Sequence, residues 1–503
     1  MQKRLISLLL VIALLLGAGM MTAVAQEGKT IRMLVGTQSF DMNTNYVGVL
    51  LEEITGYKVQ YDYYADDNQL ALEIASGTEY DLISVSPNMY QTLLAQGALK
   101  NLSAAIEAHP SVKDAISPLG WTYCTAADDG IYGVPNVDDA VYVGGIGYRT
   151  DIFAEHGYQE PATVQEFYDL LVAIKNDTGL IPLTGRNAVE PVIASGFGLS
   201  YDFVVDEETD KIVSWLRDPG MKEYLAWMNK VYTEGLIDVD WPVNTGDQIN
   251  EKISSNQAVM TFAAHWHTLN WVNALVENGH KDAYFKTIVP LEDAEGKRHI
   301  AVSNGISRVF VVPVTASDED AVYTMGMIAS RLDAENYWAF NDGIEGTHYT
   351  KGEDGIPVPI LPKFNDDMNQ GSNYQIGRNQ HEHPITWMAR VHKTQVQWDT
   401  FYDANSKAAA FGFEGRPLTF ARFPEYTEYS SALSTLCGDY FMQVIAGTET
   451  LDSYDDFVKE WEEAGGLALE EAATAWYHAN PELVNAARES TSPYNAIFGY
   501  EIK

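Results

Sequence analysis

The chain has 503 residues, 46% of them hydrophobic and 20% charged, so it can build sizeable cores and is not a disordered chain. Its 32 Lys and Arg residues stand against 70 Asp and Glu residues, which gives a net charge of −38. This charge excludes a general nucleic-acid-binding surface, which needs clustered Lys and Arg, and argues against docking on anionic lipids. The two cysteines, Cys124 and Cys437, are too few for a disulfide framework or a four-cysteine metal site, and we expect both to be free.

Residues 1–25 have the layout of a secretory signal peptide. Lys3 and Arg4 precede an apolar run, and Ala23 and Ala25 place small residues at a cleavage site. We therefore expect cleavage after Ala25 and an extracytoplasmic protein, periplasmic or secreted. An uncleaved membrane anchor is the alternative, because residues 5–25 are nearly long enough to span a bilayer. No cysteine follows the small residues, which excludes a lipid anchor at this site.

Strand and helix patterns alternate in the part of the chain that follows. Period-two or buried apolar runs predict strands at 30–36, 58–63 and 80–85, with helices near 46–54 and 68–75 between them. In the first of these helices, Tyr46, Val49, Leu50 and Ile54 are expected on one buried face. The order strand–helix–strand–helix–strand predicts a parallel sheet with crossover helices, and hence an α/β fold.

Further elements are visible downstream. Thr163 and Glu166 form a capping box that predicts a helix start, and strand patterns return at 258–262, 286–289 and 309–312. Residues 350–385 are rich in Pro, Gly, Asn and Asp, which predicts a long loop or an insertion.

Motifs that would indicate catalysis or metal binding are weak in this sequence. No phosphate-binding loop, dinucleotide fingerprint or nucleophile elbow occurs, so no cofactor is expected. The pairs His265/His267 and His381/His383 could each share a metal on a strand, but a third ligand is not indicated, and we favour hydrogen-bonded histidines.

Acidic motifs are equally unspecific. Adjacent acids at 128–129 and 138–139 could serve a glycoside hydrolase, yet adjacency means little among 70 acidic residues. The stretch from Asp238 to Asn244 departs from a calcium loop, because Trp-Pro replaces its centre and no glycine stands at the sixth position.

Aromatic residues are more informative. Several of the 11 Trp residues, Trp266 among them, stand beside polar residues rather than inside apolar runs. An aromatic ring next to hydrogen-bonding groups suits the apolar face and hydroxyl rim of a sugar, although most of these rings are expected to be core.

The order of several short segments resembles family 1 of the bacterial extracellular solute-binding proteins, the broad group of ABC-importer proteins that includes maltose-binding protein. The sequence departs from the family pattern with Arg149 for Asn, Val164 for Trp and Asn256 for Gly. The segments that carry the resemblance are Tyr80 to Asn88, Leu93 to Leu102, Asp129 to Pro135, Tyr148 to Phe153, Asn256 to Met260 and Gly343 to Tyr349.

The resemblance implies a two-lobe periplasmic-binding-protein-like fold of type II, with discontinuous lobes joined by crossing strands. It implies a first lobe of residues 26–144 and 310–425 and a second lobe of residues 145–309 and 426–503. The crossings are expected near 141–148, 303–309 and 420–430. Ligands of such folds bind in the cleft at the carboxyl ends of strands.

The resemblance also implies ligand-binding residues, without any catalytic or metal-binding ones. Carried over position by position, they are Asn88, Asp138 or Asp139, His265, Trp266 and Tyr426. Trp266 follows the strand 258–262 and is expected to stack on the ligand.

The implied function is the capture of a carbohydrate and its delivery to an ABC transporter permease by a protein expected to act as a monomer. Two alternatives stay open: a binding protein for a peptide or other small solute, and a secreted carbohydrate-active enzyme.

Overall fold

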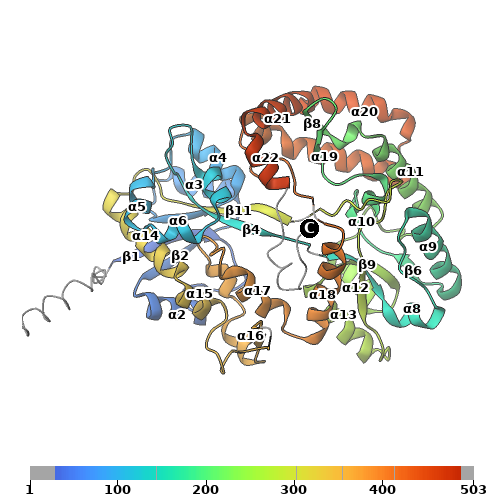
Figure 1. Cartoon of the computed structure of the whole chain (residues 1–503), viewed down its shortest axis with the longest axis horizontal. Coiled ribbons are helices and arrows are strands. Elements are labelled where there is room, and N and C mark those ends of the chain that lie inside the picture. Colours follow the sequence, from blue (N-terminus) through green and yellow to red (C-terminus); the bar gives the residue numbers. More distant parts are fainter. Residues whose placement is uncertain (1–28, 143, 302, 354, 413, 489–503) are drawn as a thin grey trace, which may run out of the picture.

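The computed structural model describes residues 29–488 except 143, 302, 354 and 413, so the expected signal peptide lies outside the described residues. Two α/β lobes lie side by side, each built around its own sheet and its own hydrophobic core (Figure 1). The first lobe is the sheet β2-β1-β3-β11-β4 with the helices packed on it, and the second is built on the sheet β10-β5-β9-β6.

The first lobe begins with the predicted alternation. β1 (Thr30–Gly36) pairs in parallel with β2 (Lys58–Tyr64) and β3 (Leu82–Val85), and α2 (Tyr46–Thr55) and α3 (Asp67–Ala75) connect them, which confirms the parallel crossover pattern. The predicted face of α2 is partly wrong. Leu50 and Ile54 pack against the core of the lobe, but Tyr46 and Val49 are exposed, and Val47 and Leu51 are the buried residues of the helix.

Two long strands complete the first sheet and reach toward the second lobe. β11 (Ser303–Val311) pairs antiparallel with both β3 and β4 (Val134–Val141), and Figure 1 shows β4 and β11 running between the lobes. Cys124, at the end of α7, is fully buried, and both cysteines are free, as predicted. Further helices of this lobe are α4 (Pro87–Ala95), α5 (Ser103–Ala108), α6 (Ser111–Ala115), α7 (Pro118–Cys124), α14 (Asp318–Leu332) and α15 (Ala334–Asn341).

The second sheet takes its strands from the middle of the chain. β5 (Gly144–Arg149) lies between β10 (Phe285–Ile288) and β9 (Ala258–Ala264), and β6 (Ile181–Leu183) pairs in parallel with β9. The predicted capping box of Thr163 and Glu166 opens a helix of 15 residues next to this sheet. The helices of this part are α8 (Thr150–His156), α9 (Val164–Thr178), α10 (Pro191–Ala194), α12 (Gly246–Ser254) and α13 (His265–Glu277).

A helical layer extends the second lobe. α11 (Pro219–Thr233) packs on α19 (Pro424–Ala446), and the hairpin of β7 (Phe203–Asp206) and β8 (Lys211–Ser214) packs on α21 (Leu467–Ala479). Two helices complete it, α20 (Tyr454–Trp461) and α22 (Pro481–Arg488).

The region expected to be a long loop or an insertion carries short elements. β12 (Tyr349–Lys351) pairs with β13 (Pro357–Pro359), and α16 (Lys363–Asp367) and α17 (His383–Val391) follow. The next helix, α18 (Gln395–Ala409), packs on α13, β10 and β5 of the second lobe. The expected first-lobe range 310–425 therefore runs too far, and the third crossing lies between α17 and α18 rather than near 420–430.

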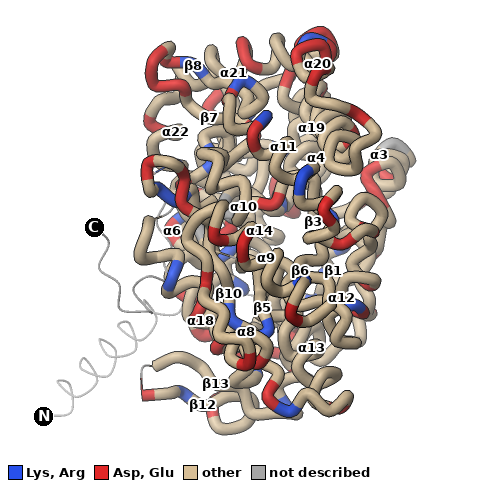
Figure 2. The backbone as a smooth tube through the Cα atoms, turned by 90° about the vertical axis from the view of Figure 1, so that its right-hand side faces the viewer, with Lys and Arg blue, Asp and Glu red and all other residues tan. Residues whose placement is uncertain are grey.

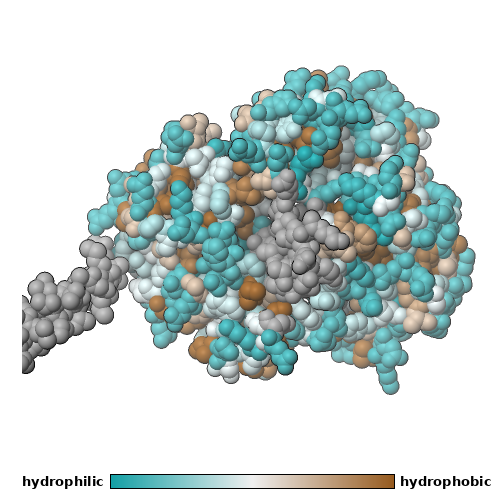
Figure 3. Space-filling view, in the orientation of Figure 1, coloured by the Kyte–Doolittle hydropathy of each residue, from teal (hydrophilic) through white to brown (hydrophobic). Residues whose placement is uncertain are grey.

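Hydrophilic residues cover most of the face in Figure 3, and hydrophobic ones form small scattered patches. Within the described ranges, no helix combines the length and the apolar character that crossing a bilayer requires.

Candidate functional site

The two sheets turn the carboxyl ends of their strands toward each other. β3 and β4 both run antiparallel to β11, and β1 runs parallel to β3. The strands β1, β3 and β4 therefore end at the same edge of the first sheet, which we call the first edge. β4 ends at Val141 and β5 begins at Gly144, so this edge lies next to the start of β5. In the second sheet, Ala264 at the end of β9 pairs with Gly144, and β6 runs parallel to β9. The strands β6 and β9 therefore end beside the start of β5, at an edge that we call the second edge. Carboxyl edges of this kind are where α/β folds bind ligands.

 

The first-edge cavity lies at the carboxyl edge of the first sheet and has a volume of 270 Å³, and it is separate from a cavity of 340 Å³ at the crossing between the lobes. Polar side chains dominate the lining of the first-edge cavity. Arg378 forms an ion pair with Asp138 and donates from Nε to Gln375 Oε1 over 3.4 Å. The polar residues around the cavity are Gln38, Ser84, Asn136, Asp138, Ser307, Arg308, Arg331, Ser372, Asn373, Gln375 and Arg378.

The second-edge cavity, of 320 Å³, lies at the ends of β6 and β9 and is more aromatic. The ring of Trp266 lines it and is 49% exposed, whereas Trp241 is buried and donates from Nε1 to the Asn187 carbonyl over 3.0 Å. Gly185 lies directly on the Trp241 ring, where a Cβ atom would come within 2.4 Å, so only glycine fits. The aromatic lining residues are Trp241, Phe262, Trp266, His267 and Trp271.

The crossing cavity lies where the lobes meet beside β11. Asn88 and Tyr123 line it from the first lobe, and Tyr201 and Tyr426 line it from the second. Arg422 spans the same boundary, since its Nη1 and Nη2 atoms donate to the carbonyls of Tyr123 and Thr125 in the first lobe over 3.0 and 2.6 Å.

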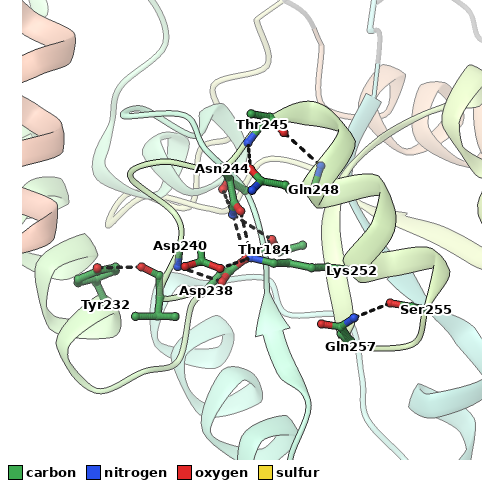
Figure 4. Close-up of polar contacts among 12 residues, drawn as sticks. Thr184, Tyr232, Asp238, Asp240, Asn244, Thr245, Gln248, Lys252, Ser255 and Gln257 are labelled. Atoms are coloured by element: carbon green, nitrogen blue, oxygen red, sulfur yellow. Dashed lines mark hydrogen bonds and ion pairs between the residues drawn. The ribbon is translucent and has the colours of Figure 1, made fainter.

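A polar network supports the strand end beneath the second-edge cavity (Figure 4). The Lys252 ammonium donates to Asp238, Asp240 and Asn244 over 2.6, 2.8 and 3.0 Å, and Thr184 donates to Asp238 over 2.6 Å. Burial alone would raise the pKa of Asp238, but the hydrogen bonds from Lys252, Thr184 and Asn244 outweigh it and hold the pKa below its usual value. The network fixes Thr184, two residues before the exposed Arg186.

A buried carboxyl lies on the other side of the second-edge cavity. Burial raises the pKa of Glu190 to about 7, and Asn187 is its side-chain donor, over 3.4 Å. Near neutral pH this carboxyl is therefore substantially protonated, unlike an exposed glutamate.

The predicted site residues separate into three groups. Asn88 and Tyr426 line the crossing cavity, Asp138 the first-edge cavity and Trp266 the second-edge cavity. His265 lines none of these three cavities. It is 7% exposed, its ring packs against Trp387 and Phe401, and burial lowers its pKa to about 3. The side chain of Asp139 lies outside the described residues.

The motifs weighed as metal sites have other partners. His267 stacks on Trp271 with ring centroids 5.2 Å apart, and His383 is buried with Nδ1 3.1 Å from the Tyr337 hydroxyl. Lys252 forms ion pairs with Asp238 and Asp240, the acids of the stretch compared with a calcium loop. Among the residues that the structure describes, no group of three or more His, Cys, Asp and Glu side chains is arranged to hold a metal ion.

Sequence reasoning missed the arginines of the cavities. Arg186 follows the end of β6 by three residues, a position that could have indicated an edge residue. The others carry no comparable signal, because they lie in the crossing strand β11, near the end of helix α14 or in irregular segments. The arginines around the three cavities are Arg186, Arg308, Arg331, Arg378, Arg416 and Arg422.

Residues 51–340 match the bacterial extracellular solute-binding protein family. An uncharacterized protein in the butB 5' region of Niallia circulans is 33% identical over 258 residues, which cover 51% of this chain and 98% of that protein. The polygalacturonan/rhamnogalacturonan-binding protein YtcQ of Bacillus subtilis (strain 168) is 22% identical over 345 residues, 65% of this chain and 66% of YtcQ.

Solved structures share the fold. The FusA substrate-binding protein of S. pneumoniae, in complex with kestose, superposes with a TM-score of 0.65 at 16% identity, over 90% of this chain and all of FusA (100%). The alginate-binding protein AlgQ2 also gives 0.65, at 17% identity, over 89% of this chain and 98% of AlgQ2. These likenesses confirm the expected two-lobe fold.

Proposed function

The chain belongs to the bacterial extracellular solute-binding proteins, and on that premise we propose that it captures a carbohydrate between its lobes and delivers it to the permease of an ABC importer. The family places the chain outside the cytoplasm. Removal of residues 1–25 after Ala25, action as a monomer and binding without turnover are parts of this proposal.

The observation that carries the proposal is the pair of facing edges. One edge offers hydrogen-bonding side chains, and the other offers the half-exposed ring of Trp266. A sugar ring has an apolar face that stacks on an aromatic ring and a rim of hydroxyl groups that need hydrogen-bond partners. The two edges together meet both needs.

Binding drives closure in this account. A ligand that contacts both edges binds the closed arrangement more tightly than the open one, so it shifts the population toward closure. The connections that would bend are those between β4 and β5, at the start of β11, and between α17 and α18. The permease then recognises the closed shape.

The names of similar proteins support a carbohydrate ligand. Similar structures include FusA in complex with kestose and the protein NgtS of Streptococcus pneumoniae in complex with Man5GlcNAc, and YtcQ is named as a polygalacturonan/rhamnogalacturonan-binding protein. For this chain a carbohydrate is our inference from the two edges and from these relatives.

A thermal-shift screen followed by calorimetry tests the proposal. The panel contains neutral oligosaccharides, acidic oligosaccharides and peptides. A ligand at 100 times its Kd stabilises the folded chain by ~2.7 kcal/mol, which a melting curve resolves. We expect stabilisation by oligosaccharides, with the bound sugar recovered intact. A response to peptides alone, or cleavage of the recovered sugar, would contradict the proposal.

A further inference from the structure

Arginines in the cavities differ from arginines elsewhere in the molecule. The described residues contain twelve arginines, and six of them line the three cavities. Each of the other six forms an ion pair with an Asp or Glu; they are Arg32, Arg149, Arg217, Arg298, Arg390 and Arg488. An arginine outside the cavities is therefore neutralised by the protein itself.

Four of the six cavity arginines have no such partner among the described acids. Arg422 donates to backbone carbonyls, and Arg331 donates to the Tyr374 carbonyl and the Tyr61 hydroxyl over 3.0 and 2.9 Å. Arg308 has a contact of 3.5 Å with Ser84 Oγ. Arg186 forms neither a hydrogen bond nor an ion pair with another residue of the described ranges.

Arg331 is the most unusual of the four. Its side chain is 2% exposed, and its Nε atom is buried with no hydrogen-bond partner. A buried guanidinium without a counter-charge costs free energy, and a chain with 70 acidic residues has many chances to neutralise it. Arg331 therefore keeps an uncompensated positive charge beside the first-edge cavity.

Acidic residues are scarce around these cavities although they are common elsewhere. Asp and Glu positions recur along the outer elements in Figure 2, with fewer Lys and Arg between them. The crossing cavity has no acidic lining residue, the first-edge cavity has Asp138, and the second-edge cavity has Glu190, whose burial favours the neutral carboxyl. The cleft is thus a positive region in a strongly negative protein.

We infer that the cleft takes an acidic oligosaccharide, one that carries carboxylate or sulfate groups, and that Arg186 and Arg308 are its specificity-determining residues. The inference rests on the proposed function and names the class of carbohydrate. A guanidinium holds an oxyanion through two parallel hydrogen bonds, and such charge-assisted bonds are stronger than neutral ones. Arg186 and Arg308 are both exposed and lie on opposite edges, so a bound chain of sugars can engage both.

The test compares four probes by calorimetry on the full-length mature protein. They are a uronate oligosaccharide, the same oligosaccharide with its carboxyls methyl-esterified, a sulfated oligosaccharide and a neutral one. We expect at least one of the two acidic probes to bind ~10-fold more tightly than the esterified and neutral probes, a difference of ~1.4 kcal/mol. Added salt should reduce the preference, because it screens exposed charges.

Two variants and one control assign the effect to the cleft. Arg186→Gln and Arg308→Gln should each remove most of the preference for the acidic probe and leave the affinity for the ester nearly unchanged. Both replace exposed side chains without an ion pair, so the fold should tolerate them. Arg488→Gln removes an equal charge at an ion pair with Glu207 and should leave the preference intact.

The outcomes separate this inference from the proposed function. Equal or tighter binding of the ester and neutral probes would overturn the acidic ligand and leave carbohydrate binding in place. Binding of none of the four would overturn both. Comparison of the uronate and sulfated probes identifies the oxyanion that the cleft prefers.

Discussion

The two edges that face each other across the cleft are built differently. The first edge is polar, and one of its arginines, Arg378, is already paired with an acid of the same edge, Asp138. The second edge is aromatic, leaves Arg186 unpaired and rests on the buried network around Lys252. The difference indicates that the two edges have different roles in binding. The second edge is a rigid stacking surface, and the first edge orients the ligand through hydrogen bonds.

Removal of the cation beneath the second edge should have the largest effect. Lys252→Met leaves Asp238, which is 1% exposed, without its counter-charge, and loss of one member of a buried pair costs about 3 kcal/mol or more. Chemical denaturation should show this loss, together with weaker ligand binding at the displaced edge. Lys222→Met, which breaks an exposed pair with Asp455, is the control and should change little. Equal effects of the two variants would show that the network does not support the edge.

The pH dependence of stability should reveal Glu190. Its pKa rises from 4.5 in the unfolded chain to about 7 in the folded one, so the folded state binds the extra proton. The stabilisation is complete below pH 4.5 and is lost as the pH rises through 7. Glu190→Gln should remove this slope and raise the free energy of unfolding at pH 8 by about 3 kcal/mol, since each pKa unit corresponds to ~1.4 kcal/mol. An unchanged pH dependence of stability in the variant would show that a group other than Glu190 causes it.

Loss of the stacking surface should weaken binding without unfolding the protein. Trp266→Ala removes a half-exposed ring from the second-edge cavity, and a central aromatic of this kind contributes ~2 kcal/mol, about thirtyfold in Kd. Calorimetry checks the affinity, and a melting curve without ligand checks the fold. Phe411→Ala is the matched control, because Phe411 is 51% exposed and lines none of the three cavities. Unchanged affinity in Trp266→Ala would remove the second edge from the binding site.

The smallest expected effect is at the paired arginine. Asp138→Asn frees Arg378 for the ligand, so an acidic oligosaccharide should bind up to about fivefold more tightly, the size of a partly exposed ion pair. The esterified probe reports any effect unrelated to charge. Weaker binding of both probes would show instead that the Asp138 carboxylate holds ligand hydroxyls.

The sequence predicted the strands and the edge positions better than the side-chain environments. Apolar runs and caps are local signals, so β1, β2, β9 and the start of α9 lie where their patterns place them. The apolar residues of α2 lie on more than one side of the helix, so the sequence pattern alone does not decide which side packs on the sheet. α18 belongs to the second lobe because it packs against α13, which lies more than a hundred residues earlier in the chain. The pattern of a helix does not encode such a distant contact.

The same limit applies to the site. Trp266 and His265 are neighbours in the sequence, yet one ring lines a cavity while the other is enclosed by Trp387 and Phe401 from α17 and α18. The charge pattern of the cleft is also non-local, since Arg378 and Asp138 are 240 residues apart. Only the folded chain shows which arginines lack an acidic partner.

Small-angle X-ray scattering on the wild-type protein, with and without a saturating oligosaccharide, tests the central claim most directly. A ligand held between the two edges should draw the lobes together, so the radius of gyration should fall on binding and should fall less in Trp266→Ala at equal occupancy. Calorimetrically complete binding with unchanged scattering would contradict the account, because the ligand would then occupy one lobe alone.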